Sequence, residues 1–428
     1  MSEPGWVTHA VWWQVYPLGF VGAYPPREGA GGLGRITAWL DYAVELGASG
    51  ILLGPVFASE THGYDTVDHL RIDPRLGDDA DFDALVTAAH DRGLRVLLDG
   101  VFNHVGRGHA AFQAALSEGE SASTANWFRR DDSGQYATFE GHDALVALNH
   151  AEPAVADYVV EVMTHWLRRG ADGWRLDAAY AVPTAFWAEV LPRVRAEFPD
   201  AYTVGEVIHG DYAEFVTEST VDTVTQYELW KAVWSALNAG NFFELSWALE
   251  RHNGFLDTFV PQTFVGNHDV TRLASKLEDE RHIALALVLL LTVGGTPSIW
   301  AGDEQGFRGV KEDRAGGDDA VRPAFPEKPA DLAPYGWTLY HLHQELIGVR
   351  RRHAWLHTTR VRTVHLTNEQ FVYEAGALLV ALSVGAASVE LPAPYAKKVL
   401  NGTAELKQAG SADAVLILPA AGWAILER

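Results

Sequence analysis

The stretch DGWRLDAAY, residues 172–180, decides how the rest of the chain is interpreted. Trp174, Arg175 and Leu176 predict a short strand that ends on the carboxylate of Asp177. Because side chains alternate along a strand, Arg175 and Asp177 point to the same side. A fixed cation there is expected to lower the carboxyl pKa and keep Asp177 ionised at neutral pH, as a nucleophile requires. The alternative is a structural Arg–Asp pair that closes the strand end.

Apolar runs recur along the chain and alternate with helical patterns, which predicts an α/β fold, a (β/α)8 TIM barrel. Helical spacing of apolar residues covers 81–92 and 153–169. The expected strands are Val11–Tyr16, Gly50–Leu53, Arg95–Leu98, Gly173–Leu176, Tyr202–Val204, Thr223–Thr225, Gln262–Val265 and Pro297–Trp300. A doubly wound open sheet is the competitor, but it calls for a glycine-rich phosphate turn that the sequence lacks.

Two regions do not follow the alternation of strands and helices. Residues 104–149 are polar and loop-rich after the third strand, which predicts a short inserted domain over the active face. From about residue 360 short alternating runs predict a C-terminal antiparallel β-sandwich domain. We therefore expect the barrel at 1–103 and 150–355, the insert at 104–149 and the β-domain at 356–428.

Composition narrows the classes of partner. The net charge of −23 argues against nucleic acid and against anionic membrane surfaces. The apolar run at 283–295 is too short to span a bilayer and predicts a buried helix. The start, MSEPGWVTHAVWW, has no signal-peptide pattern, and the chain has no cysteine, so we expect a cytoplasmic protein.

Ionisable side chains gather at the predicted strand ends, which meet at one face of such a barrel. They are His62, Tyr64 and Asp65 after the second strand, Asp99, Asn103 and His104 at the third, Arg175 and Asp177 at the fourth, Glu206 at the fifth, and Asn267, His268 and Asp269 at the seventh. A single strand-end carboxylate is more often a helix cap, but a whole set of them is not explained by capping.

Three such carboxylates suit the cleavage of a glycosidic bond. Asp177, paired with Arg175, would attack the sugar carbon, while Glu206, with no cation beside it in sequence, would carry the proton. Asp269 would be an electrostatic partner. His104 and His268 could donate to sugar hydroxyls. The alternative chemistry is a divalent metal bound by the same carboxylates, but the lysine base of enolising barrels is missing near these ends.

These residues resemble the signature regions of glycoside hydrolase family 13, the α-amylase family. The matching motifs, in family order, are DGVFNH at 99–104, DGWRLDAA at 172–179, GEV at 205–207 and FVGNHD at 264–269. The resemblance implies a retaining mechanism on α-linked glucose, with Asp177 as nucleophile, Glu206 as acid/base and Asp269 as transition-state stabiliser.

The resemblance also implies a substrate-binding set around the attacked glucose: Tyr64, His104, Arg175, His268, Arg322 and Asp318, with His62 at the site edge. Asp319 competes with Asp318 for the acidic position of the pair with Arg322. The family requires no cofactor. Secreted members carry a Lys-His pair whose histidine helps to bind calcium, and here Tyr180 and Ala181 stand there, so we expect no metal among the site residues, and calcium is possible but not expected.

Within the family, the short insert and LNHAEPAV at 148–155 most resemble the neopullulanase and cyclomaltodextrinase group, and the compact chain also resembles cyclic maltosyl-maltose hydrolase. We expect hydrolysis of α-1,4-linked glucans, most of all short or cyclic maltodextrins. A transglycosylase or isomerase on the same fold stays open, as does a non-catalytic binding protein of this fold. A homodimer is also open, although the first strand begins near Val11 and leaves no room for the N-terminal β-domain through which many relatives pair.

Overall fold

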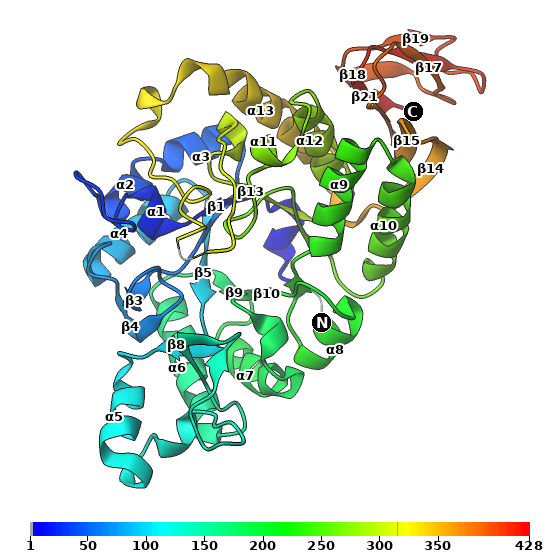
Figure 1. Ribbon diagram of the computed structural model, residues 1–428. Helices are drawn as coiled ribbons and strands as arrows, with labels where there is room; N and C mark the ends of the chain where they lie inside the picture. The colour runs from blue at the N-terminus through cyan, green and yellow to red at the C-terminus, as the bar shows by residue number, and fades with distance from the viewer. Residues whose placement is uncertain (1–2, 315) are drawn as a thin grey trace.

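The computed structural model describes residues 3–314 and 316–428. At its centre eight parallel strands form one sheet in the order β11-β10-β9-β5-β2-β1-β13-β12 (Figure 1). They are β1 Trp12–Val15, β2 Gly50–Leu53, β5 Arg95–Gly100, β9 Gly173–Leu176, β10 Tyr202–Gly205, β11 Thr223–Val224, β12 Gln262–Phe264 and β13 Thr296–Trp300. A parallel bridge between Thr225 and Gln262 joins the two outer strands. The sheet therefore closes into the expected TIM barrel, with all eight strands at the predicted places.

Helices surround the barrel and start at recognisable caps. Before α4, Asp79–His90, the side chain of Asp78 accepts from the backbone and Asp81 returns the contact, which forms a capping box. This cap starts the helix two residues before the predicted Asp81. Glu152 and Pro153 begin α6, Pro153–Arg168, as expected. The others are α1 Pro17–Phe20, α2 Leu33–Thr37, α3 Leu40–Leu46, α7 Thr184–Glu197, α8 Tyr212–Ser219, α9 Tyr227–Ala239, α10 Phe242–Phe255, α11 Leu273–Lys276, α12 His282–Thr292 and α13 Trp337–Arg352.

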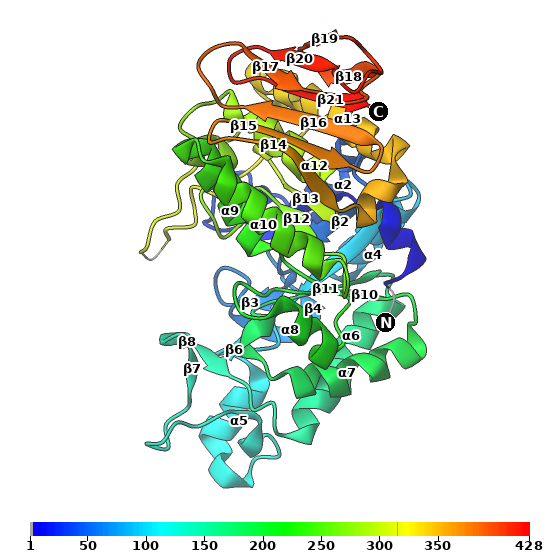
Figure 2. The same cartoon turned by 90° about the vertical axis from the view of Figure 1, so that its right-hand side faces the viewer.

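The segment after β5 forms a small structure at one end of the molecule (Figure 2). It holds the three-stranded antiparallel sheet β6-β8-β7, built from β6 His104–Gly106, β7 Thr138–Phe139 and β8 His142–Ala147, together with α5 Ala110–Glu118. The rings of Phe112, Phe128 and Tyr136 pack edge to face, and they extend the main hydrophobic core into this segment. A two-stranded hairpin, β3 Phe57–Ser59 and β4 Thr66–Ile72, lies in the loop after β2.

At the opposite end the chain closes with two antiparallel sheets (Figure 2). One has the order β14-β15-β16-β21-β18 and the other β17-β20-β19. Their strands are β14 Val361–Leu366, β15 Gln370–Ala375, β16 Leu378–Ser383, β17 Val389–Pro392, β18 Lys398–Gly402, β19 Glu405–Lys407, β20 Val415–Leu418 and β21 Trp423–Glu427. Apolar residues of both sheets, such as Leu379 and Leu416, share one core, so this region is the expected sandwich.

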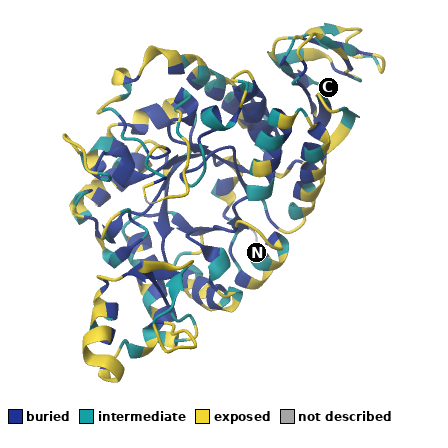
Figure 3. Cartoon of the chain, viewed as in Figure 1, coloured by how far each residue is buried: buried dark blue, intermediate teal, exposed yellow. Residues whose placement is uncertain are grey.

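The interior of the barrel is buried throughout (Figure 3). The predicted buried helix at 283–295 is α12, of which every residue except Ala284 is buried. Of the helices formed by the described residues, none is long and apolar enough to cross a membrane. Apolar layers fill the middle of the barrel, whereas charged side chains such as Asp99 and Arg175 are buried toward the carboxyl ends of its strands.

Burial of histidines makes the stability of this fold sensitive to acid. Desolvation lowers the pKa of His69 to about 3 and that of His104, His109, His252 and His343 to about 4. In an unfolded chain these histidines have a pKa of about 6.5. Between the two values the unfolded state binds more protons, so each of these histidines makes the fold less stable as the pH falls.

We predict that His343→Gln removes one such contribution. Relative to the parent, the variant should gain about 1.4 kcal/mol of unfolding free energy per pH unit on acidification from about pH 6 to 5. Urea unfolding at a series of pH values measures the difference. The control is His341→Gln, since His341 is exposed on the same helix. A parent–variant difference for His343 that stays constant with pH contradicts the prediction.

Candidate active site

One guanidinium stands at the centre of the site. Arg175 on β9 has Nη1 at 2.8 Å from Asp99 and 3.1 Å from Asp177, and Nη2 at 2.7 Å from Glu206 and 4.0 Å from Asp269. The side chain is almost fully buried. It therefore gathers carboxylates from the ends of four strands, β5, β9, β10 and β12, into a single cluster.

The pKa of Asp177 corrects one expectation from the sequence. Burial raises the pKa of the Asp177 carboxyl well above its ordinary value, and the charges of Glu206, Asp99 and Asp269 raise it further. Arg175 lowers this pKa, but its charge is shared among four carboxylates and offsets only part of the increase. The isolated Arg175–Asp177 pair therefore does not exist, and the expected low pKa was wrong.

The environment of Glu206 corrects a second expectation. Sequence placed no cation beside it, yet its contact with Arg175 is shorter than that of Asp177. The Arg175 side chain crosses to the neighbouring strand end, which sequence distance does not reveal. Glu206 Oε2 also accepts the backbone N–H of Ala178 at 2.9 Å. Ala178 has a left-handed φ of 43°, a strained conformation for alanine that turns its N–H toward Glu206.

Asp269 has further partners besides Arg175. Arg322 Nη2 lies 2.8 Å from Asp269 Oδ1, and His268 Nε2 lies 2.9 Å from Oδ2. Burial alone would raise the pKa of Asp269, but His268, Arg322 and Arg175 outweigh it and hold that pKa well below its usual range. Asp269 is therefore anionic at neutral pH.

His268 is occupied by protein partners. The amide of Gln14 donates to its Nδ1 at 3.1 Å, so its Nε2 carries the proton that faces Asp269 and the hydroxyl of Tyr64. Its ring stacks at 5.6 Å on the ring of Tyr64. Both nitrogens of His268 thus have protein partners, and its role as a donor to sugar stays a prediction.

The remaining predicted residues frame these carboxylates. Asp318 pairs with Arg322 at 3.2 Å, so the structure selects it over Asp319. His104 Nε2 donates to the carbonyl of Tyr64 at 3.0 Å, and burial lowers the pKa of His104 to about 4, so the ring is neutral. His62 accepts the backbone N–H of Tyr64 at 3.2 Å and thereby holds the loop that carries it.

The carboxylates open into one cavity of about 340 Å³. Predicted residues that line it are Tyr64, His104, Asp177, Glu206 and Asp269. Arg175, His268 and Arg322 contact the lining carboxylates, and Asp318 pairs with Arg322. The segment after β5 closes one side of the cavity with Phe139, Glu140 and Leu145.

Some lining residues were not among the predicted set. Tyr227, at the start of α9, donates its hydroxyl to Glu206 Oε1 at 3.3 Å and accepts from Asn267 at 2.9 Å. Its position directly after a predicted strand was a usable signal. Tyr180 donates to Glu140 at 2.8 Å across the mouth of the cavity. No local pattern indicates that contact, because Glu140 is brought there by the fold of the insert.

Asn103 has a partner within the site. It directs its side-chain amide to His104 Nδ1 at 3.1 Å and so orients that ring. Across residues 3–314 and 316–428, no group of three or more histidines and carboxylates is arranged to hold a metal ion.

Comparison with known proteins places this geometry in a family. The family described as "Alpha amylase, catalytic domain" matches residues 14–134 and 119–359. A cyclomaltodextrinase of Geobacillus thermopakistaniensis is 32% identical over 82% of this chain and 64% of its own length. Neopullulanase 2 of Thermoactinomyces vulgaris is 32% identical over 87% of this chain and 68% of its own length. The chain thus spans about two thirds of these relatives.

A solved structure agrees over the whole chain. The cyclic α-maltosyl-(1→6)-maltose hydrolase of Arthrobacter globiformis, in complex with its cyclic ligand, superimposes with a TM-score of 0.86 at 25% identity and covers 100% of both chains. The family match takes in the barrel, the insert and every strand end that bears a clustered carboxylate. This chain belongs to the α-amylase family, glycoside hydrolase family 13.

Proposed function

We propose that the protein is a retaining hydrolase of α-glucosidic bonds that acts on short or cyclic maltodextrins. The observation that carries the proposal is the single cavity onto which Asp177, Glu206 and Asp269 all open. Relatives named cyclomaltodextrinase and neopullulanase support the substrate class, and the cyclic maltosyl-maltose hydrolase supports a compact chain of this kind acting on a cyclic glucan. We also propose a cytoplasmic location, which the cysteine-free composition supports.

In the proposed first step the Asp177 carboxylate attacks the anomeric carbon and forms a glycosyl ester. Glu206 gives its proton to the glycosidic oxygen as that bond breaks. In the second step Glu206 takes a proton from water, the water oxygen attacks the anomeric carbon, and Asp177 is released. Both transition states carry positive charge on the sugar ring, which the permanent negative charge of Asp269 stabilises.

In this scheme Asp177 and Glu206 share the positive charge of Arg175. Arg175 sits between the nucleophile and the proton carrier, so the loss of a proton from one group is felt by the other. As Glu206 gives up its proton to the leaving oxygen, its new negative charge is compensated by Arg175 at 2.7 Å. At the same moment Asp177 loses its charge to the glycosyl bond, so the total charge around Arg175 is conserved.

We predict that Glu206→Gln retains binding of maltoheptaose and loses hydrolysis of unactivated maltodextrins by several orders of magnitude, because the amide cannot protonate the leaving oxygen. Calorimetry and product analysis measure the two properties. Glu161→Gln is the control, since Glu161 is an exposed glutamate on α6 and does not line the catalytic cavity. Unchanged turnover in Glu206→Gln would exclude our assignment of the acid/base, and binding without hydrolysis in the parent would favour the non-catalytic alternative.

We predict that Asp99→Asn moves the acid limb of kcat/KM to lower pH. The negative charge of Asp99 raises the pKa of Asp177, and the neutral amide of the variant removes that effect. Arg175 then has one carboxylate fewer to compensate and lowers the pKa of Asp177 further. Because Asp177 must be ionised to attack, a lower pKa extends activity toward acid. Asp222→Asn is the control, a buried carboxylate paired with Arg195 at 3.1 Å near the amino ends of the strands. An acid limb that moves to higher pH contradicts the shared-cation model.

Hydrolysis and transglycosylation share the glycosyl-enzyme ester and differ only in the acceptor. We predict that maltotetraose yields only shorter products at early times, as expected when water is the acceptor. Chromatography of the first few per cent of conversion provides the measurement. Oligomers longer than the substrate at that stage would identify a transglycosylase.

A further inference from the structure

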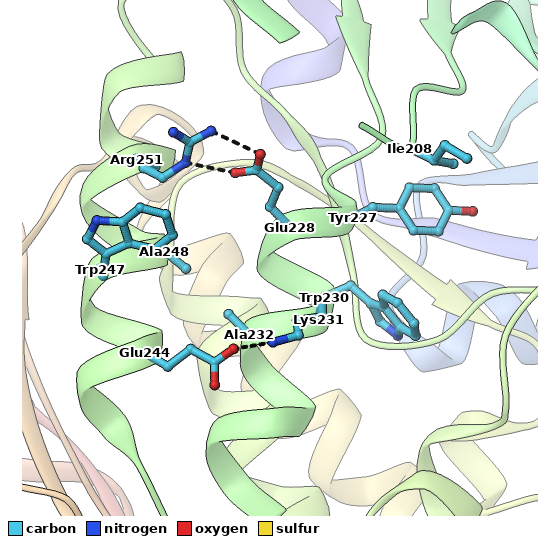
Figure 4. A pocket seen from close by; sticks show the side chains of 10 residues that line it. All are labelled: Ile208, Tyr227, Glu228, Trp230, Lys231, Ala232, Glu244, Trp247, Ala248 and Arg251. Carbon is cyan, nitrogen blue, oxygen red and sulfur yellow. Dashed lines mark hydrogen bonds and ion pairs between the residues drawn. The ribbon is translucent and has the colours of Figure 1, made fainter. Parts of the chain in front are cut away.

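A second hollow lies beside the catalytic cavity, on the outer surface of α9 and α10 (Figure 4). Its volume of about 590 Å³ exceeds the 340 Å³ of the catalytic cavity and is typical of ligand sites, which span roughly 300–1,000 Å³. From α10 it is lined by Glu244, Trp247, Ala248 and Arg251, spaced along one face of that helix. We call it the α9–α10 groove.

Two ion pairs bridge the helices at the ends of the groove. Arg251 holds Glu228 through two bonds of 3.0 Å, Nε to Oε2 and Nη2 to Oε1. Lys231 pairs with Glu244 (Figure 4). The pairs link the two helices. Because these side chains are partly exposed, they also leave oxygens and N–H groups that can form hydrogen bonds with hydroxyls. The groove is therefore a firm surface with polar ends.

Trp247 lies between the two pairs and is 63% exposed. The guanidinium of Arg251 lies 5.3 Å from the centre of its ring and restrains it. Such a large exposed indole on a rigid helix has an unfavourable contact with water unless a ligand covers it. The C–H face of a pyranose ring is a flat, weakly apolar surface rimmed by hydroxyls, so it matches an indole flanked by charged groups.

The groove adjoins the catalytic cavity. Ile208 and Tyr227 line both hollows, and Tyr227 donates its hydroxyl to Glu206. Under the proposed function, Glu206 protonates the leaving oxygen, so the departing sugar lies against Glu206. Ile208 follows two residues later and presents a side chain 36% exposed. The departing part of the glucan would thus extend across Ile208 and Tyr227 toward Trp247.

We propose that the α9–α10 groove binds the departing side of a longer α-glucan, with Trp247 as the platform for a sugar ring. The inference rests on the proposed function for the direction of the chain. It explains why the groove abuts Glu206 and why an indole is exposed between charged pairs. A second copy of the protein covering Trp247 is the competing occupant.

The test compares two substrates in Trp247→Ala. In 4-nitrophenyl α-maltoside the departing group is one small ring, which stays beside Glu206 and does not reach Trp247. In maltoheptaose the departing part extends into the groove. We expect kcat/KM for maltoheptaose to fall about 5- to 10-fold, mainly through KM, while kcat/KM for the nitrophenyl substrate changes less than about twofold. The control is Phe243→Ala, since Phe243 is 51% exposed on the same helix and does not line the groove.

Equal losses on both substrates, or no loss on either, overturn the proposal. Sedimentation of the parent and of Trp247→Ala tests the competing occupant: a parent oligomer that dissociates in the variant assigns Trp247 to a protein contact and also overturns it. If the parent hydrolyses neither substrate, the proposed function fails while the groove remains testable. Calorimetry then decides, because maltoheptaose should bind the parent and Phe243→Ala alike and bind Trp247→Ala about 5- to 10-fold more weakly.

Discussion

The contact on which the site depends is the sharing of one guanidinium by four carboxylates. Arg175 is buried at the carboxyl end of the barrel and lies within 4.0 Å of Asp99, Asp177, Glu206 and Asp269. Burying so many like charges is unfavourable unless a cation compensates them at short range. The four strand ends meet only because the barrel is closed, so the charge cluster exists only in the complete fold. The buried cluster therefore lowers the stability of the fold at this position, and it holds together carboxylates whose proton affinities depend on one another.

The four carboxylates have different numbers of arginine and histidine partners. Asp99, Asp177 and Glu206 depend on Arg175, and burial raises the pKa of Asp99 and of Asp177. Asp269 also has His268 and Arg322, which hold its pKa low. Such a site can transfer a proton and form a bond at one end while keeping a constant negative charge at the other. That combination is what a reaction through a positively charged sugar ring requires.

Helix α9 connects the chemistry with the surface. Its first residue, Tyr227, contacts Glu206 from one side and lines the α9–α10 groove on the other. The insert lines the opposite wall, where Glu140 receives a hydrogen bond from Tyr180. Elements outside the eight strands thus shape both approaches to the carboxylates. The barrel supplies the clustered carboxylates, and the additions line the cavity around them.

Sequence alone determined the strands, the barrel and the identity of the carboxylates. Strand patterns are local, because burial on both faces demands continuous apolar runs, and the motifs around Asp177, Glu206 and Asp269 stand in a fixed order. Only the tertiary structure decided the electrostatics. Arg175 reaches Glu206 on the neighbouring strand, so its charge could not be assigned to Asp177 from spacing, and Ala178 adopts a left-handed turn that no propensity indicates. Asp318 was distinguished from Asp319 by its contact with Arg322, and His268 receives a hydrogen bond from Gln14, a residue far away in the chain. Charge acts through space and depends on burial, whereas sequence patterns record only neighbours along the chain.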